Sequence, residues 1–135
     1  MADLSINVVA VMAPSGAIPQ TLLATVNFNH GDVIYAINST HAGLANAAVN
    51  INTAAARGIA VGNGYTGQPI PYVDAGTITI GATVPVGHIL VLSPNAGKIG
   101  NHADLTTNHY LTPLGYGNNS TTIELAIYPT GIQRA

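Results

Sequence analysis

Two similar stretches of the chain, about residues 25–76 and about residues 81–131, constrain its fold more than any other feature. Each opens with a glycine, a polar residue and an apolar run, beginning at Gly31 and at Gly87. Each continues through matching runs that contain glycine: Ala42-Gly43-Leu44 and Ala96-Gly97-Lys98-Ile99, Arg57-Gly58-Ile59-Ala60-Val61 and Pro113-Leu114-Gly115-Tyr116, then β-prone stretches ending at Gly76 and Gly131. A unit of a few strands cannot bury its apolar face alone, so two facing units would close one core. We therefore predict an all-β fold, a small β-sandwich or partly closed β-barrel built from two repeated units, as one domain over residues 21–135.

The predicted strands are short apolar runs rich in Val, Ile, Thr and Tyr, separated by clusters of Gly, Pro and Asn. Several runs alternate, so that in residues 77–80 the threonines share one face and the isoleucines the other. The predicted strands cover residues 5–12, 22–27, 33–37, 58–61, 69–73, 77–80, 88–92, 111–116 and 122–128.

Two turns and at most one or two short helices complete this prediction. Asn63-Gly64 is a strong hairpin signal, and Asn95-Ala96-Gly97 is a second turn. Residues 42–56 contain seven alanines, which favour a short helix, although asparagines and β-branched residues interrupt them. A further turn of helix is expected within residues 101–110.

Charged residues make up only 6% of the chain, with three basic and five acidic side chains and a net charge of -2. Three cations cannot neutralise a phosphate backbone, which excludes electrostatic binding of nucleic acid. No run approaches the ~20 apolar residues that cross a bilayer, so we expect no membrane partner. A surface of Asn, Thr, Ser and Gly loses its water cheaply, and interface cores are depleted in charge. We expect permanent contact with other subunits; the alternative is a stable β domain with a neutral surface.

Residues 1–20 lie outside the repeat and form a predicted N-terminal arm. Residues 5–12 are apolar and β-prone, whereas Pro14 and Pro19 prevent regular structure between the arm and the domain. Such a strand on a Pro-Gly tether suits addition to the sheet edge of a partner. The alternative is that it forms the first strand of the domain's own sheet. The N-terminus has no positively charged region, so we expect no secretory signal.

Candidate chemistry is weak. His102, Asp104 and His109 could supply three metal ligands. The same His-x-Asp spacing occurs in His30-Gly31-Asp32, but at a different place in its repeat, so the two pairs are not one duplicated site. We interpret these residues as solvated turns and predict no metal and no cofactor. Ser93 lies in no nucleophile elbow and Glu124 has no second acid nearby in the sequence, so we predict no enzyme activity. Asn38-Ser39-Thr40 and Asn119-Ser120-Thr121 match a glycosylation pattern but are interpreted as turns.

Two of the six tyrosines, Tyr65 and Tyr116, lie beside glycines near predicted turns. A tyrosine in such a place can stack on a sugar or pack in a subunit interface. The sequence leaves both roles open. The tyrosines within strands are expected to be core or rim residues.

The chain resembles the head decoration, or capsid cement, proteins of tailed bacteriophages. The resemblance covers roughly residues 25–131 and rests on a cadence of glycines and β-residues: Gly31-Asp32-Val33-Ile34-Tyr35, Ala56-Arg57-Gly58-Ile59-Ala60-Val61 and Gly67-Gln68-Pro69-Ile70-Pro71-Tyr72, with the echo Val86-Gly87-His88-Ile89-Leu90-Val91-Leu92-Ser93, Gly97-Lys98-Ile99 and Leu114-Gly115-Tyr116. It implies a β-rich virion protein on the outer capsid surface that binds the major capsid protein, often as a trimer, and stabilises the shell.

By the same resemblance, residues 2–20 would be an arm that engages the major capsid protein. The arm residues expected to make contacts are apolar residues and prolines: Leu4, Ile6, Val8, Val9, Val11, Pro14, Ile18 and Pro19. One alternative is a phage tail or head-fibre component. Another is a carbohydrate-binding β-module that uses Tyr65, Tyr116 and the Asn-rich loops.

Overall fold

The computed structural model describes residues 3, 4, 6, 11, 12, 20–62, 64–101 and 105–133. Within these residues the chain is all-β, as predicted, with no helix. Its strands are β1 Val11–Met12, β2 Gln20–Ala24, β3 Val33–Ala36, β4 His41–Leu44, β5 Ala56–Ala60, β6 Pro69–Val73, β7 Ala75–Ile80, β8 Ile89–Leu92, β9 Ile99–Asn101, β10 Pro113–Gly117 and β11 Thr122–Ala126. The part of the chain that the structure describes contains no apolar helix of membrane-spanning length.

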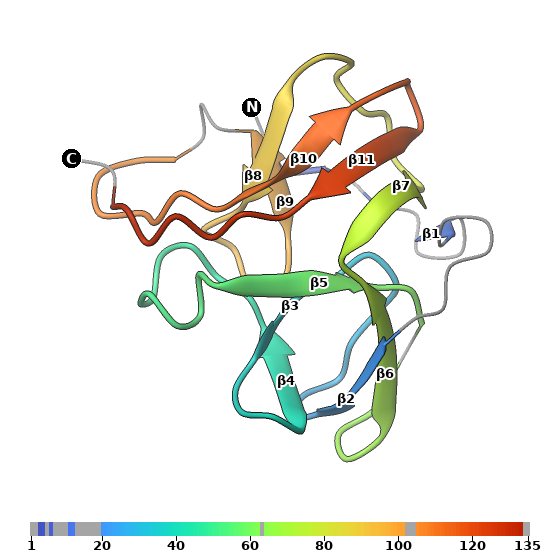
Figure 1. The fold of residues 1–135 in the computed structure, drawn as a ribbon, viewed down its shortest axis with the longest axis vertical. Coiled ribbons are helices and arrows are strands. Elements are labelled where there is room, and N and C mark those ends of the chain that lie inside the picture. Colours follow the sequence, from blue (N-terminus) through green and yellow to red (C-terminus); the bar gives the residue numbers. More distant parts are fainter. Residues whose placement is uncertain are drawn as a thin grey trace.

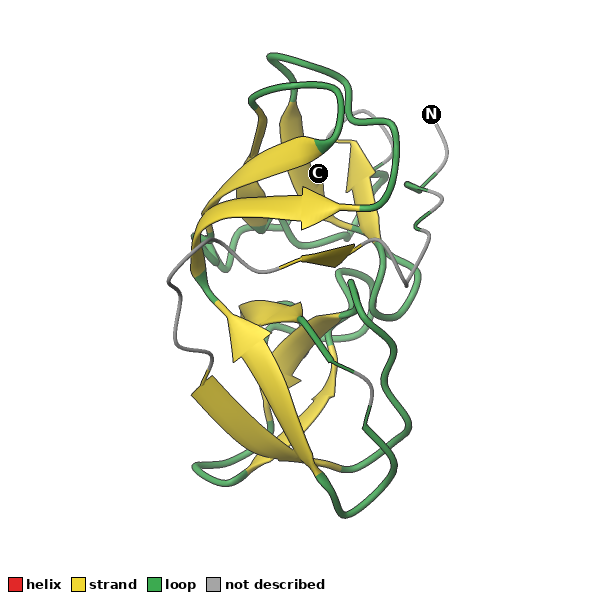
Figure 2. Ribbon diagram, turned by 90° about the vertical axis from the view of Figure 1, so that its right-hand side faces the viewer, coloured by secondary structure: helices red, strands yellow, loops and turns green. Residues whose placement is uncertain are grey.

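The strands form two sheets, one above the other in Figure 1. The lower sheet is a closed barrel in the order β2-β4-β3-β5-β6, and the upper sheet has six strands in the order β1-β7-β11-β10-β8-β9. Turned by a quarter, the molecule still shows two stacked halves (Figure 2). One apolar cluster contains residues of both sheets, including Val33, Ile59, Leu90 and Ile123, while a second cluster around Ile34 and Ile70 comes from the barrel half alone.

The two halves have the same strand connectivity. In the first half β3 pairs with β4 and β5, β5 with β6, and β6 with β2, all antiparallel. In the second half β8 pairs with β9 and β10, β10 with β11, and β11 with β7, again antiparallel. Residues from β2 to β6 therefore correspond to residues from β7 to β11. The duplication predicted from the sequence is a structural duplication, but its bounds differ from the predicted ones. β2 and β7 are the first strands of the two units, whereas the sequence placed the starts of the repeats after both strands, at about residues 25 and 81.

The correspondence extends to single hydrogen bonds. Gly31 donates its backbone N–H to the carbonyl of Ala60, and Gly87 donates to that of Gly117, both at 2.8 Å. Gly31 and Gly87 both have positive φ angles, 88° and 78°, a backbone conformation that favours glycine. The glycine before the second strand of each unit is thus favoured by its backbone geometry.

A β-bulge also recurs at the same place in both units. In the first unit the register between β3 and β5 shifts next to Gly58, which lies opposite Ile34. In the second unit the register between β8 and β10 shifts next to Gly115, which lies opposite Leu90. A side chain at either glycine would collide with the next strand. A Cβ on Gly58 would lie 2.7 Å from the carbonyl oxygen of Val73, and one on Gly115 would lie 2.0 Å from a backbone oxygen of β11. The matched pair Gly58 and Gly115 is therefore explained by bulge packing.

The predicted helix over residues 42–56 is wrong. β4 occupies its beginning, and turns lead from there to β5. Five of its seven alanines are buried, and two of these lie where the chain passes close to other segments: Ala47 donates a backbone hydrogen bond to Ser93, and the carbonyl of Ala54 accepts one from Thr112. Tertiary contacts override the helix propensity of alanine here. No helix appears in the described part of residues 101–110 either.

Other local predictions hold with small shifts. The turn at Asn95-Ala96-Gly97 is confirmed by a hydrogen bond from the Lys98 N–H to the Asn95 carbonyl. β5 and β6 do form a hairpin, but its reverse turn closes between Tyr65 and Gln68, while Asn63 lies outside the described residues. Strands β4 and β9 were not predicted. The strand pairing also corrects one predicted match between the repeats. Gly43 of β4 lies opposite Tyr35 of β3, and its equivalent in the second unit is Gly100 of β9 rather than Gly97.

Candidate interaction surface

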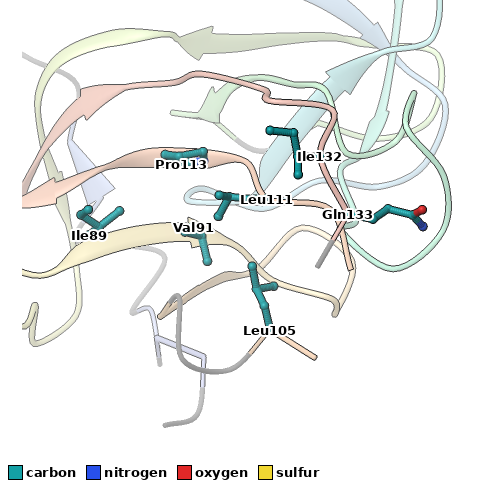
Figure 3. Close-up of a pocket in the computed structure, with 7 residues that line it drawn as sticks. All are labelled: Ile89, Val91, Leu105, Leu111, Pro113, Ile132 and Gln133. Carbon is teal, nitrogen blue, oxygen red and sulfur yellow. The ribbon is translucent and has the colours of Figure 1, made fainter. Parts of the chain in front are cut away.

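An apolar groove of about 450 Å³ lies beside the six-stranded sheet (Figure 3). Four elements supply its lining. β8 contributes Ile89 and Val91, the strand β10 and the residues before it contribute Pro113 and Leu111, and the loop after β9 and the C-terminal segment complete it with Leu105, Ile132 and Gln133. Strand alternation explains why Ile89 and Val91 point to the same side, because residues two apart share a face.

The C-terminal segment is held in place along the groove by hydrogen bonds. Leu111 donates its N–H to the carbonyl of Ile132 at 2.9 Å, and its own carbonyl accepts the Thr130 hydroxyl at 2.6 Å. The amide of Gln133 donates to the Asn108 carbonyl at 3.1 Å, and Tyr110 and Gln133 form a β-bridge. The groove is therefore a formed feature of the fold, in which a strand-like segment supplies one wall.

Among the described residues, the side chains that line this groove are all uncharged. Two aliphatic residues of its lining, Ile89 and Ile132, keep 53% and 63% of their surface accessible, and we call them its exposed rim. Tyr116 lies directly opposite Ile89 in the β8–β10 ladder and is itself 48% exposed, so it extends the apolar surface across the sheet. The next residue in this row is Glu124, whose carboxylate accepts a 2.5 Å hydrogen bond from Thr77. Such a surface suits a partner that covers it with apolar and neutral groups.

A second recess, of about 430 Å³, lies in the first unit. It combines the ring of Tyr35 with polar side chains of the loop between β4 and β5, and its lining residues are Tyr35, Ala36, Ile37, Asn50, Asn52, Thr53 and Ala55. Asn50 and Thr53 fix the loop through mutual hydrogen bonds, including Thr53 N–H to Asn50 Oδ1 at 2.9 Å. The recess is neutral and polar, which distinguishes it from the apolar groove.

The structure places Tyr65 and Tyr116 in different halves of the molecule. Tyr65 is 67% exposed in the loop before β6, at the lower end of the barrel, whereas β10 lies in the upper sheet (Figure 1). Tyr116 joins the apolar groove through its neighbour Ile89, and Tyr65 does not. The two tyrosines therefore cannot contribute to one compact ligand site.

The described residues of the N-terminal arm contact the chain's own core. Leu4 and Ile6 pack against the shared cluster, and Val11 is buried within it. Val8, Val9, Pro14, Ile18 and Pro19 lie outside the described residues. Of the two possibilities for this segment, a strand of the domain's own sheet is what the structure shows at Val11–Met12, which pairs with β7. The contacts of the arm with a capsid remain a prediction.

The histidine motifs do not assemble into a site within the described residues, where no three His, Cys, Asp or Glu side chains converge. His102 and Asp104 lie outside those residues. Asp32 accepts a 2.9 Å hydrogen bond from the Asn29 N–H, and burial raises the pKa of its carboxyl more than this bond and Lys98 lower it. Asn38 and Asn119 form turns, since each side-chain oxygen accepts backbone N–H groups two and three residues later.

Sequence reasoning did not find the apolar groove. Leu105, Leu111 and Ile132 come from three segments that meet only in the folded chain. One signal was available: the chain after residue 128 carries an aliphatic residue, Ile132, outside any predicted strand.

In comparisons with known proteins, no family model, no curated protein and no solved structure matched the chain.

Proposed function

We propose that this chain is a structural virion protein that decorates the outer surface of a phage capsid and cements neighbouring copies of the major capsid protein. The observation that supports this most is the apolar groove with its exposed rim at Ile89 and Ile132, in a chain where only 6% of residues are charged. A rim of this kind gains free energy when a protein partner covers it, and the neutral surface around it is cheap to desolvate.

Cementing of this kind requires no chemistry. A protein that binds only the assembled shell stabilises that shell by mass action, and copies joined in a homo-oligomer, such as a trimer at a symmetry axis, bind more tightly through effective concentration. The duplicated β-structure supports the proposal because two units that share one core form a rigid block. The function that the resemblance implies is thus compatible with the surface that the fold presents.

The test is binding to expanded, undecorated shells assembled from the major capsid protein of the same genome, measured by co-sedimentation. The double variant Ile89→Ser and Ile132→Ser removes two aliphatic side chains that are about half exposed. Covering the exposed half of each contributes about 1 kcal/mol, so we expect about 30-fold weaker binding. Val26→Ser with Ile37→Ser is the matched control, because these aliphatic side chains are also about half exposed, at 41% and 47%, and follow strands of the barrel half. Failure of the full chain to bind, or equal binding by both double variants, would refute the proposal.

A second candidate function is binding of a neutral glycan, and the recess around Tyr35 favours it. An aromatic ring beside amide and hydroxyl groups is a combination that recognises sugars through stacking and hydrogen bonds. Asn52→Ala should then abolish binding on a glycan array while Asn118→Ala, in a loop of the second unit, leaves it unchanged. An array without any bound glycan would eliminate this candidate.

A further inference from the structure

Within the described residues, the strand pairing of the two units differs at the seam where the first strand meets the third. In the first unit β2 pairs directly with β4 in parallel, with Leu23 opposite His41, and this pairing closes the barrel. The corresponding strands of the second unit are β7 and β9. Within the described residues no ladder joins β7 to β9, so the second unit is not closed by its own strands.

The N-terminus of the chain occupies this seam. We call the described residues 3, 4, 6, 11 and 12 the N-terminal strap. At one end of the strap the Leu4 N–H donates to the Ile99 carbonyl of β9 at 2.9 Å, and the Asn95 amide donates to Asp3 at 2.8 Å. At the other end β1 pairs antiparallel with β7, with Val11 opposite Ile80. One segment thus bonds to both edges of the open unit.

The strap also supplies apolar side chains to the core that the two halves share. Val11 is only 6% exposed, and Leu4 and Ile6 pack against the core cluster shared by the two halves. Gly31 leaves room for two of them: a Cβ at this position would lie 3.0 Å from Ile6 and 3.4 Å from Val11. The seam therefore has room for the apolar side chains of the strap.

We propose that the N-terminal strap is an exchangeable strand, which a second copy of this chain can supply to the seam between β7 and β9. Identical contacts form whether the strap comes from the same chain or from another copy, so the choice depends on local concentration and on the connection. Residues 13–19 connect the strap to β2, and seven residues span up to about 25 Å when extended. Pro14 and Pro19 have no N–H to donate, which limits the backbone bonds this connection can form.

This exchange is independent of the proposed capsid function, since it requires only copies of the chain. Exchange of the N-terminal strap would link two copies of the chain through contacts that already exist within one copy. The resulting oligomer is joined by the same hydrogen bond to Ile99 and the same β1–β7 pairing that close the single chain.

The chain contains no cysteine, so single cysteines give an unambiguous test. Met12 lies opposite Thr79 in the β1–β7 ladder. Full-length Met12→Cys and Thr79→Cys, one of them carrying a size tag, are refolded together and oxidised, and the disulfide-linked heterodimer is measured on a non-reducing gel. We expect several-fold more heterodimer than from Met12→Cys mixed with Thr66→Cys, where Thr66 is an exposed residue at the far end of the barrel.

The variant that carries both Met12→Cys and Thr79→Cys in one chain provides the reference. An internal disulfide in this chain, together with no heterodimer above the Thr66→Cys control in the mixture, would show that the strap stays in its own chain and would overturn the proposal. Absence of the internal disulfide would mean that the β1–β7 ladder does not form, and the proposal would fail with it. Because no capsid is present, either result leaves the capsid test unaffected.

Discussion

Replacement of Gly115 by alanine tests the tightest packing around any glycine of the described residues. Gly115 has a φ angle of 154°, and a Cβ there would lie 2.0 Å from the backbone oxygen of Glu124. The obstacle is main chain in the adjacent strand of the sheet, which cannot rotate away as a side chain would. The strands β10 and β11 must therefore separate, and the ladder between them must weaken.

The expected loss combines two contributions. Steric overpacking in a filled interior costs about 1–3 kcal/mol, and a residue held in a sparsely populated backbone region costs about 1–3 kcal/mol more. We expect Gly115→Ala to lower the free energy of unfolding by about 4 kcal/mol, a large part of the 5–15 kcal/mol typical of a domain. Urea denaturation followed by tyrosine fluorescence and far-ultraviolet circular dichroism measures this change.

Gly87→Ala is the matched control. Gly87 has a positive φ of 78°, but nothing lies within 4 Å of a Cβ there, so only backbone strain applies, about 1–2 kcal/mol. If Gly115→Ala loses no more stability than Gly87→Ala, the bulge does not require a glycine for packing. The explanation of the duplicated Gly58 and Gly115 would then be wrong.

Three further predictions follow from single side chains. Thr112→Val removes the buried 2.5 Å hydrogen bond to the Ala54 carbonyl and should lower the free energy of unfolding by about 1–3 kcal/mol in a urea titration; an unchanged midpoint would contradict this. Val11→Ala deletes a buried part of the strap and should cost about 2 kcal/mol in the same assay, whereas a cost near zero would place the strap outside the core. Because burial raises the pKa of Asp32, its ionised form destabilises the fold. Stability relative to Asp32→Asn should therefore fall as pH rises from the ordinary range of aspartate through the raised value, and then level off; parallel curves between about pH 3 and 7 would refute this.

The sequence alone was enough to predict the class of the fold and its duplication. Alternating runs such as residues 77–80 identify strands because side chains of a strand point to opposite faces in turn. The glycines at 31 and 87, and at 58 and 115, revealed the repeat because each answers a local backbone or packing requirement that both units share. Such requirements can be recognised in the sequence, because glycine is the residue type that satisfies them.

The strands β4 and β9 and the absence of a helix at residues 42–56 could not be read locally. Short alanine-rich segments have a weak preference, and their state depends on which neighbours they can pair with. β4 forms because β2 and β3 pair with it on either side. Ala54 is held outside a helix because its carbonyl accepts a hydrogen bond from the Thr112 hydroxyl. β2 and Thr112 are distant along the chain from the segments that they fix.

The surfaces that support the function were decided by tertiary structure as well. The groove brings Leu105, Leu111 and Ile132 together from separate segments, and the strap reaches both β7 and β9 at the seam that the first unit closes by itself. The sequence by itself determined a neutral, duplicated β-protein, because composition and glycine spacing act locally. Only the folded chain decided which apolar faces stay open, because exposure depends on what every distant segment leaves uncovered.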